Sequence, residues 1–298
     1  MNKIIGILIA LTLFSCGKKS SQKEDLKNEK LTVITVNYPL FYFAEKIGGN
    51  TIDLQYIIPA DVDPAFWNPN ESALEIYQSA DIILTNGANY AKWMENVSLP
   101  SSRLMNTSSS FENQLISLKS IPSHNHGPDG EHKHNGYAIT TWLNFKLALK
   151  QAESVRTILV NKIPNEKTAL DENFNELKKD LEDLDEKMTL AASNLSELNL
   201  IGSHPVYQYL SKGYKLNIRS VHFEPNEVPT FEQWEQLTKL LDASKNNLML
   251  WEDSPNSETV KKLTELNIEL RVFNPCANKP VDGDFLSIMN NNINNLKR

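Results

Sequence analysis

Short apolar runs alternate with amphipathic stretches along residues 31–141. The apolar runs predict strands, and the stretches with apolar residues three or four positions apart predict helices. The predicted strands are Leu31–Val36, Ile52–Ile58 and Asp81–Thr85, and the predicted helices are Pro39–Ile47, Ser72–Gln78 and Ala88–Met94. Such alternation is typical of parallel strands joined by helices that cover both faces of a sheet.

The same alternation of strand and helix patterns recurs along residues 198–298. The predicted strands there are Asn199–Gly202, Asn217–Val221, Leu248–Glu252 and Glu269–Phe273, and the predicted helices are Val206–Lys212, Thr230–Ser244, Ser257–Leu266 and Phe285–Leu296. Thr230, with Gln233 three residues later, has the pattern of a capping box. The expected fold class is therefore α/β, with two lobes that are each a mostly parallel sheet flanked by helices.

Residues 142–197, between the two predicted lobes, carry no strand signal. Pro164 divides this segment, and one apolar stripe follows it over residues 166–193 at Leu170, Phe174, Leu177, Leu181, Leu184 and Met188. At 1.5 Å per residue this helix would be roughly 40 Å long, enough to run the height of a two-lobed protein. A coiled coil is the weaker alternative, because the stripe covers fewer than four heptads. We expect one long rigid helix that joins the lobes.

The first thirty residues predict export and an anchor. Lys3 precedes the apolar run Ile4–Phe14, which is too short to span a bilayer, so residues 1–15 are predicted to be a signal peptide. Leu13-Phe14-Ser15-Cys16 resembles a lipobox, which would make Cys16 the lipid-modified first residue, and the polar residues 16–30 a tether. An uncleaved membrane anchor is the alternative, and both place the protein outside the cytoplasm. Cys276, the remaining cysteine, is expected to be a small buried residue rather than a nucleophile.

The composition and the absence of several motifs argue against some classes of function. The chain has 298 residues, 40% hydrophobic and 22% charged residues, and a net charge of −7, which is ordinary for a globular protein of two lobes. The acidic balance argues against a nucleic-acid partner. The sequence lacks the HExxH, GxSxG, P-loop and GxGxxG motifs, so we expect no enzyme. We expect a monomer.

Four of the six histidines lie in a loop predicted over residues 123–136. They are His124, His126, His132 and His134, interspersed with Asp129 and Glu131. Imidazole and carboxylate groups are ligands of Zn²⁺ and similar ions, but the spacing is not that of a structural zinc site. We therefore expect weak binding by several ligands, with a solvated polar loop as the alternative.

The order of motifs resembles the zinc/manganese class of ABC-transporter solute-binding proteins over nearly the whole mature chain. The resemblance is carried by the lipobox, Asn37-Tyr38-Pro39-Leu40, Gly48-Gly49, Ile58-Pro59-Ala60-Asp61-Val62-Asp63-Pro64, Asp81–Gly87, the histidine-rich loop, Trp142-Leu143, Gly202-Ser203-His204, Glu227-Val228-Pro229-Thr230 and Phe273-Asn274-Pro275. It implies two α/β lobes joined by a long helix, with the metal between the lobes on three histidines and a carboxylate.

Residue by residue, the resemblance places only one of these four ligands in this chain. The expected positions are occupied by Ala65, Thr140, His204 and Asn274. Alanine offers no donor atom, and the neutral oxygens of threonine and asparagine are poor ligands for Zn²⁺. The usual site between the lobes therefore cannot form from these positions, and an ordinary histidine at a strand end is an equal alternative for His204.

Two alternatives remain open. In the first, His222 joins His204 at neighbouring strand ends, with Glu252 or Asp253 adding charge and the histidine-rich loop adding imidazoles. Glu252 and Asp253 have a competing role as caps of the helix that follows them. In the second, Trp67, Trp142 and Trp251 form an aromatic cleft for a small organic ligand or a metal chelate.

The expected function is that of a lipid-anchored solute-binding protein in the periplasm or cell envelope. It would capture a divalent metal as cargo, with zinc favoured over manganese, for an ABC permease in the inner membrane, without an organic cofactor. The alternative is a degenerate paralogue that acts as an envelope metal buffer or chaperone, or that binds another small ligand in the cleft. An adhesin role is also open.

Overall fold

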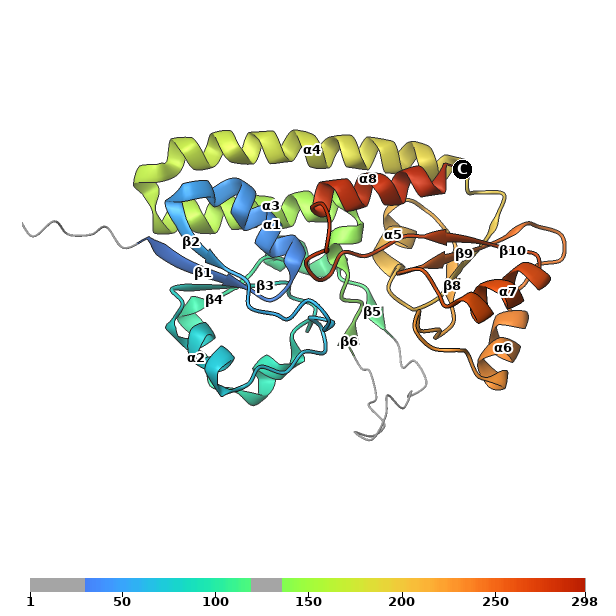
Figure 1. The fold of residues 1–298 in the computed structure, drawn as a ribbon. Helices are drawn as coiled ribbons and strands as arrows, with labels where there is room; N and C mark the ends of the chain where they lie inside the picture. Colours follow the sequence, from blue (N-terminus) through green and yellow to red (C-terminus); the bar gives the residue numbers. More distant parts are fainter. Residues whose placement is uncertain (1–29, 119–135, 298) are drawn as a thin grey trace, which may run out of the picture.

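Two four-stranded parallel sheets lie side by side beneath a long helix (Figure 1). The computed structural model describes residues 30–118 and 136–297. The predicted signal peptide, Cys16, the tether as far as residue 29 and the four histidines of the loop lie outside the described residues. The α/β fold with two lobes is confirmed.

The N-terminal sheet has the strand order β2-β1-β3-β4. Its strands are β1 (Leu31–Thr35), β2 (Ile52–Gln55), β3 (Ile82–Thr85) and β4 (Leu104–Asn106), and its helices are α1 (Tyr38–Gly48) and α2 (Glu71–Ser79). The central strands β1 and β3 pair in parallel with Val33 opposite Ile82, and both residues are fully buried. Asn37 begins α1 by accepting the amide of Leu40 on its side chain.

The C-terminal sheet has the strand order β10-β9-β7-β8. Its strands are β7 (Asn199–Gly202), β8 (Ile218–Ser220), β9 (Asn247–Trp251) and β10 (Ile268–Val272), and its helices are α5 (Gln208–Gly213), α6 (Phe231–Thr238) and α7 (Ser257–Glu265). The last helix, α8 (Phe285–Leu296), leaves this sheet and packs against α4 and α1, where Phe285 meets the ring of Phe43 at 5.4 Å.

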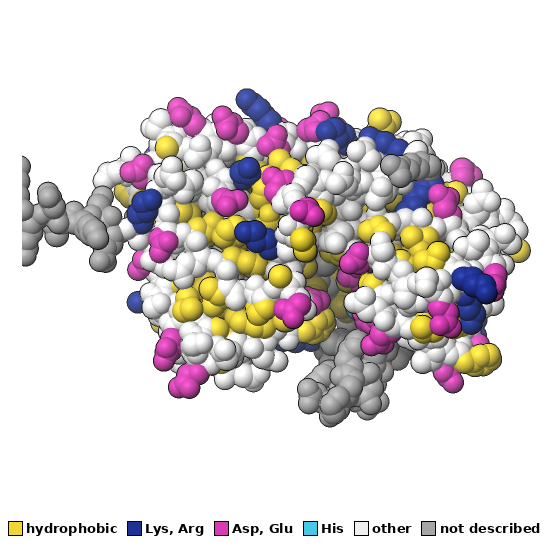
Figure 2. Space-filling model, viewed as in Figure 1, with side chains coloured by type: hydrophobic (Ala, Val, Ile, Leu, Met, Phe, Trp, Pro, Cys, Tyr) yellow, Lys and Arg dark blue, Asp and Glu magenta, His cyan; other side chains and the backbone are white. Residues whose placement is uncertain are grey.

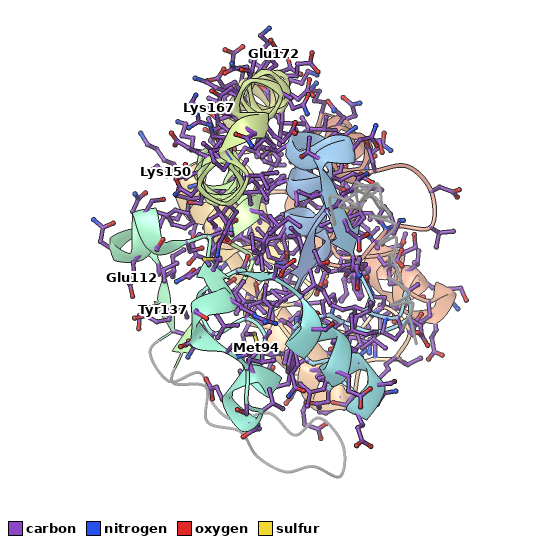
Figure 3. The ribbon with its side chains drawn as sticks, turned by 90° about the vertical axis from the view of Figure 1, so that its left-hand side faces the viewer. Met94, Glu112, Tyr137, Lys150, Lys167 and Glu172 are labelled. Carbon is purple, nitrogen blue, oxygen red and sulfur yellow. The ribbon has the colours of Figure 1, made fainter. Side chains whose placement is uncertain are left out.

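Two antiparallel helices, α3 (Phe145–Lys162) and α4 (Lys167–Ser193), form a spine along the molecule (Figure 1). The predicted stripe of α4 faces inward at Leu177, Leu181 and Leu184, which are buried. In the end-on view of Figure 3, Lys150, Lys167 and Glu172 project away from the sheets. Over the described ranges, no helix is long and apolar enough to span a membrane.

Several predicted elements differ from the observed ones. Residues 88–94 form no α-helix, because Gly87, Ala88 and Asn89 have positive φ and only a short 3₁₀ turn follows at Lys92–Asn96. The helix predicted over Thr230–Ser244 ends at Thr238, because the carbonyl of Leu240 accepts hydrogen bonds from Asn199 and Arg219 of the neighbouring strands.

Three short strands were not predicted. One is β4, and the other two, β5 (Ser117–Leu118) and β6 (Gly136–Tyr137), pair as an antiparallel ribbon. They are only two or three residues long, too short to show a period in the sequence.

Candidate metal centre

Three candidate ligands follow three adjacent strands of the C-terminal sheet. His204 lies two residues beyond β7, His222 two residues beyond β8, and Glu252 directly after β9. Because β7 lies between β9 and β8 and all three strands are parallel, their carboxyl ends meet at one edge. The predicted convergence of His204 with His222 and Glu252 is therefore present in the structure.

Gly202 allows the ends of β7 and β8 to approach closely. A Cβ atom at this position would lie 2.7 Å from Ser220 Oγ and 3.0 Å from the ring of Tyr207. A side chain at position 202 would therefore force Ser220 or Tyr207 beside it to shift.

His204 lies among the other candidate ligands. Its ring centroid is 5.4 Å from that of His222, with the two rings nearly perpendicular. Nδ1 of His204 is 3.4 Å from Oε1 of Glu252, and Nε2 is 3.5 Å from Oε1 of Glu224. Two ligands of a tetrahedral zinc ion, each about 2.0–2.1 Å from the metal, stand about 3.3 Å apart. Either distance suits a pair of ligands, but the imidazole binds one ion through one nitrogen, so only one of the two carboxylates can share an ion with His204.

The electrostatics of this edge favour a cation. Glu252 is partly enclosed, with 28% of its side chain exposed. Burial, followed by the charges of Asp63 and Glu224, raises the pKa of Glu252 to about 8. A proton or a bound cation would relieve the repulsion among these carboxylates.

The ligands are near one another but do not form a completed coordination shell. Within residues 30–118 and 136–297, no group of three His, Cys, Asp or Glu side chains surrounds a single ion position. Side chains at this edge would therefore turn toward an ion as it binds.

The three substituted positions of the resemblance have structural roles. Ala65 is buried, and its amide donates to Asp63 Oδ1 at 2.8 Å. The hydroxyl of Thr140 donates to the carbonyl of Val206 in the opposite lobe. Oδ1 of Asn274 accepts the amide of Cys276 at 2.7 Å. Each of the three residues thus takes part in a hydrogen bond of the protein itself.

Further hydrogen bonds hold the two lobes together. Trp142 Nε1 donates to the carbonyl of Pro275 at 2.7 Å, and the amide of Tyr38 donates to the carbonyl of Ala277 at 3.0 Å. Figure 2 shows acidic side chains on both sides of the groove between the lobes. Hydrogen bonds thus join the lobes beside a groove that carries acidic side chains on its rim.

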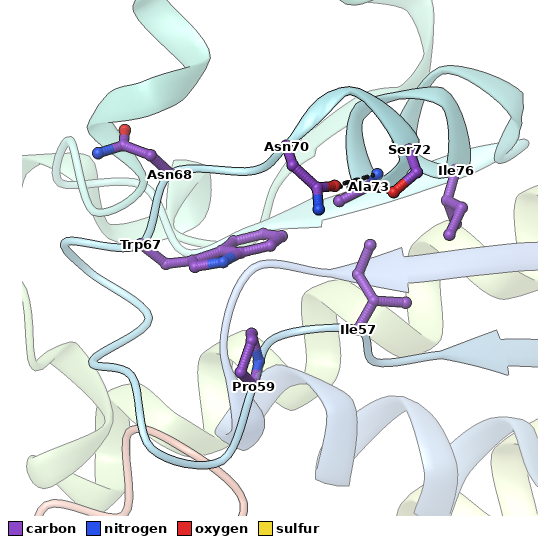
Figure 4. A pocket seen from close by; sticks show the side chains of 8 residues that line it. All are labelled: Ile57, Pro59, Trp67, Asn68, Asn70, Ser72, Ala73 and Ile76. Carbon is purple, nitrogen blue, oxygen red and sulfur yellow. Dashed lines mark hydrogen bonds between the residues drawn. The ribbon is translucent and has the colours of Figure 1, made fainter.

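The predicted aromatic cleft is wrong. Trp142 and Trp251 are fully buried in the core, where no cleft ligand reaches them. Trp67 lines a different hollow of about 290 Å³ on the N-terminal lobe, together with Pro59 and the start of α2 (Figure 4). The three rings therefore do not share one binding site.

The remaining predictions concern Asp253 and Cys276. Asp253 is exposed and accepts the amide of Ser254, while Asn256 caps α7, so neither predicted acid is the helix cap. Cys276 is buried as expected, and burial, assisted by the charge of Asp284, raises the pKa of its thiol to about 12. Such a thiol is a poor nucleophile.

Two acids near the site were not predicted as ligands. Glu224 lies two residues beyond His222, a spacing that places both side chains on the same side of an extended segment. The second is Asp63, on the other lobe, whose charge contributes to the raised pKa of Glu252. The sequence gives no signal for this effect, because the two residues lie on different lobes.

Comparison with known proteins agrees with this architecture. Residues 33–298 match the model of the ZnuA family, described as zinc-uptake complex component A, periplasmic. The zinc-binding lipoprotein AdcA of Streptococcus pneumoniae R6 is 22% identical over 99% of this chain and 60% of its own length. The high-affinity zinc uptake system protein ZnuA of Bacillus subtilis is 24% identical, over 96% of this chain and 93% of its own.

Solved structures show the same fold. The metal-dependent lipoprotein YcdH of Bacillus subtilis has a TM-score of 0.75 at 22% identity, covering 90% of this chain and 98% of that one. Zn(II)-bound AdcA of Streptococcus pneumoniae has a TM-score of 0.74 at 20% identity, covering 90% of this chain and 57% of that one. This chain spans about 60% of the length of its AdcA relatives. The match over residues 33–298 shows that the chain belongs to the family of zinc-uptake complex component A.

Proposed function

We propose that this protein captures a divalent metal, zinc foremost and manganese as an alternative, and delivers it to an ABC permease. The family is one of zinc-uptake components, which are transport proteins and not enzymes. The proposal is supported by relatives whose names describe zinc binding and zinc uptake. The alternative of a degenerate paralogue with another ligand is not favoured by these relatives.

The observation that carries the proposal is the meeting of His204, His222 and Glu252 at one sheet edge. Two imidazoles and a carboxylate are ligand types that zinc prefers. His204 contacts Glu252 at 3.4 Å and lies 5.4 Å from the ring of His222. These three residues would bind the cargo. Glu224 lies against the other ring nitrogen of His204, and Asp253, which is exposed and accepts the amide of Ser254, stays outside the set.

The proposal also includes a lipid anchor and a location in the cell envelope. The lipobox at Cys16 and the lipoprotein names of relatives support an anchor in the cell envelope, with the mature protein a monomer in the periplasm. The loop with His124, His126, His132 and His134 would bind zinc more weakly and raise its concentration near the crevice.

Equilibrium dialysis of the metal-free full chain against micromolar Zn²⁺ tests the function. We expect one tightly held zinc ion, lost in the His204→Ala and His222→Ala variants. A variant lacking residues 124–134 should lose only weaker binding and keep the tight ion. The function is refuted if the unmodified chain takes up neither Zn²⁺ nor Mn²⁺. If only the loop deletion abolishes binding, the proposed site is wrong and the protein is a metal buffer.

A further inference from the structure

The segment between β10 and α8 crosses from the C-terminal sheet toward the N-terminal lobe (Figure 1). Its residues 274–278 are called the strap here. The carbonyl of Pro275 accepts Trp142 Nε1 at 2.7 Å, and the carbonyl of Ala277 accepts the amide of Tyr38, at the start of α1, at 3.0 Å. The strap is therefore a continuation of the C-terminal lobe that is hydrogen-bonded to the rest of the molecule along its length.

The first part of the strap is held by buried groups. Asn292 of α8 accepts the amide of Asn274 on Oδ1 at 2.9 Å and donates its Nδ2 to the carbonyl of the same residue at 2.7 Å. Asn292 is 3% exposed, Cys276 is 2% exposed and Trp142 is fully buried. Breaking such bonds leaves polar groups without water or any other partner, which is costly. This part of the strap is therefore firmly fixed.

The last residue of the strap, Asn278, binds the loop between β2 and α2 (residues 56–70). Its side-chain amide donates to the carbonyls of Pro59 at 2.6 Å and Val62 at 2.7 Å. Its Oδ1 accepts the hydroxyl of Tyr56 at 2.7 Å. One asparagine side chain thus ties three residues of this loop to the strap.

The contact at Asn278 is accessible to water, unlike the first part of the strap. Asn278 is only half-buried and Pro59 is exposed. Three residues beyond Asn278 the chain is in open solvent, because Val281 is 96% exposed. Water can take the place of either partner in a hydrogen bond of this kind, so its net contribution to stability is small. The strap therefore has a fixed start and an end that can be released.

The loop that Asn278 holds has room to move. Its backbone hydrogen bonds include short turns of its own, such as the amide of Val62 to the carbonyl of Pro59 at 3.3 Å. Ile57, Pro59 and Trp67 of this loop line the hollow of about 290 Å³ beside the start of α2 (Figure 4). The loop is therefore not closely packed against α2 on this side, and a shift of the loop needs no rearrangement of the core.

We propose that Asn278 is a latch between the lobes. With its amide bonded, the loop 56–70 is held against the strap. When the two donated bonds open, the loop moves away while the buried start of the strap stays in place. Because this loop follows β2 at the carboxyl edge of the N-terminal sheet, the edge at which α/β proteins bind ligands, the latch controls access to the groove between the lobes. The inference goes beyond the proposed function and holds for any ligand of the groove.

Asn278→Asp tests the latch with a side chain of the same shape. The change removes the donor and places a carboxylate oxygen opposite the carbonyls of Pro59 and Val62, whereas the hydroxyl of Tyr56 can still donate. Asn295→Asp is the matched control. Asn295 is also half-buried, and its side-chain amide donates to the carbonyl of Val272 at 3.0 Å, a bond within the C-terminal lobe.

Hydrogen exchange of the metal-free full-length protein, read by mass spectrometry, measures the opening of the loop. Peptides from residues 56–67 should exchange at least about tenfold faster in Asn278→Asp, because two hydrogen bonds that oppose opening are lost. A peptide that contains Tyr38, whose amide reports the bond to Ala277, should keep its rate. Asn295→Asp should leave the exchange of residues 56–67 within about twofold of the unmodified chain.

The thiol of Cys276 provides a second readout. It lies in the strap and is 2% exposed, so it reacts with a maleimide only if the strap itself lifts. Labelling, read from the mass of the peptide that contains Cys276, should be equally slow in Asn278→Asp and in the unmodified chain. Melting curves of both variants would show that each is folded.

Two outcomes would overturn the inference. Unchanged exchange of residues 56–67 in Asn278→Asp would show that the side chain of Asn278 does not hold the loop. Faster labelling of Cys276, or faster exchange at Tyr38, would show that the strap detaches as a whole and that Asn278 is no separate latch. Neither measurement uses a metal, so a failure of the proposed zinc binding would leave this test intact.

Discussion

Replacing Glu252 by glutamine should stabilise the metal-free protein at neutral and alkaline pH. The folded protein holds the pKa of Glu252 at about 8, whereas the ordinary value is 4.5. Below pH 4.5 the side chain is protonated in the folded and unfolded states alike. As pH rises from 4.5 to 8 the unfolded chain loses the proton while the fold retains it, so stability falls with pH. Glutamine cannot ionise and avoids this loss.

The size of the effect follows from the same values. One pKa unit corresponds to about 1.36 kcal/mol, so at pH 7, which is 2.5 units above the ordinary pKa, the cost is at most about 3.4 kcal/mol. Because 28% of the side chain is exposed, water compensates part of this cost, and we expect about 1–2 kcal/mol.

Urea unfolding of chelator-treated protein at about pH 5 and pH 8 would measure this difference. Glu252→Gln should be more stable than the unmodified chain at pH 8 and nearly equal to it at pH 5. Glu227→Gln, a change at an exposed glutamate of the same lobe, serves as the control and should have little effect at either pH.

Bound zinc should make the unmodified chain more stable than the Glu252→Gln variant. Because Glu252 is a proposed ligand, saturating Zn²⁺ should stabilise the unmodified chain more than the variant. A stability difference that is the same at both pH values, or a variant that is less stable at pH 8 without metal, would refute the assigned environment of Glu252.

Two further predictions concern the packing that holds the lobes in place. Leu181→Ala, in the buried stripe of α4, should lower the free energy of unfolding in urea by about 2–5 kcal/mol. Leu190→Ala lies on the same helix but is 66% exposed, and it should lower that free energy by less than about 0.5 kcal/mol. Equal losses would show that the stripe does not carry the packing. Trp142→Phe removes the donor to the Pro275 carbonyl across the lobes and should cost about 1–3 kcal/mol, whereas an unchanged urea midpoint would show that this bond contributes nothing.

Much of the candidate site could be predicted from the sequence, because several of its residues directly follow predicted strands. A histidine or glutamate just after an apolar run stands at a strand end, and parallel strands gather such residues at one edge. His204, His222 and Glu252 were found in this way. Whether they bind the cargo stays a prediction.

The sequence by itself determined the two sheets and the long helix. The strand Asn199–Gly202 was predicted with its observed bounds, and the helix predicted over residues 166–193 begins one residue later, at Lys167. These elements follow from local hydrophobic periodicity, which packing in the two lobes then reinforces.

Only the tertiary structure decided the irregular backbone after β3 and the contacts between the lobes. The backbone at Ala88 and Asn89 adopts positive φ, which overrides the helical pattern of the sequence. The loop that carries Asp63 is tied to the C-terminal lobe by Asn278, and the hydrogen bond from Asn278 to Val62 joins residues 216 positions apart. No local pattern encodes such a contact, because its partners meet only after both lobes have folded and packed against the same spine.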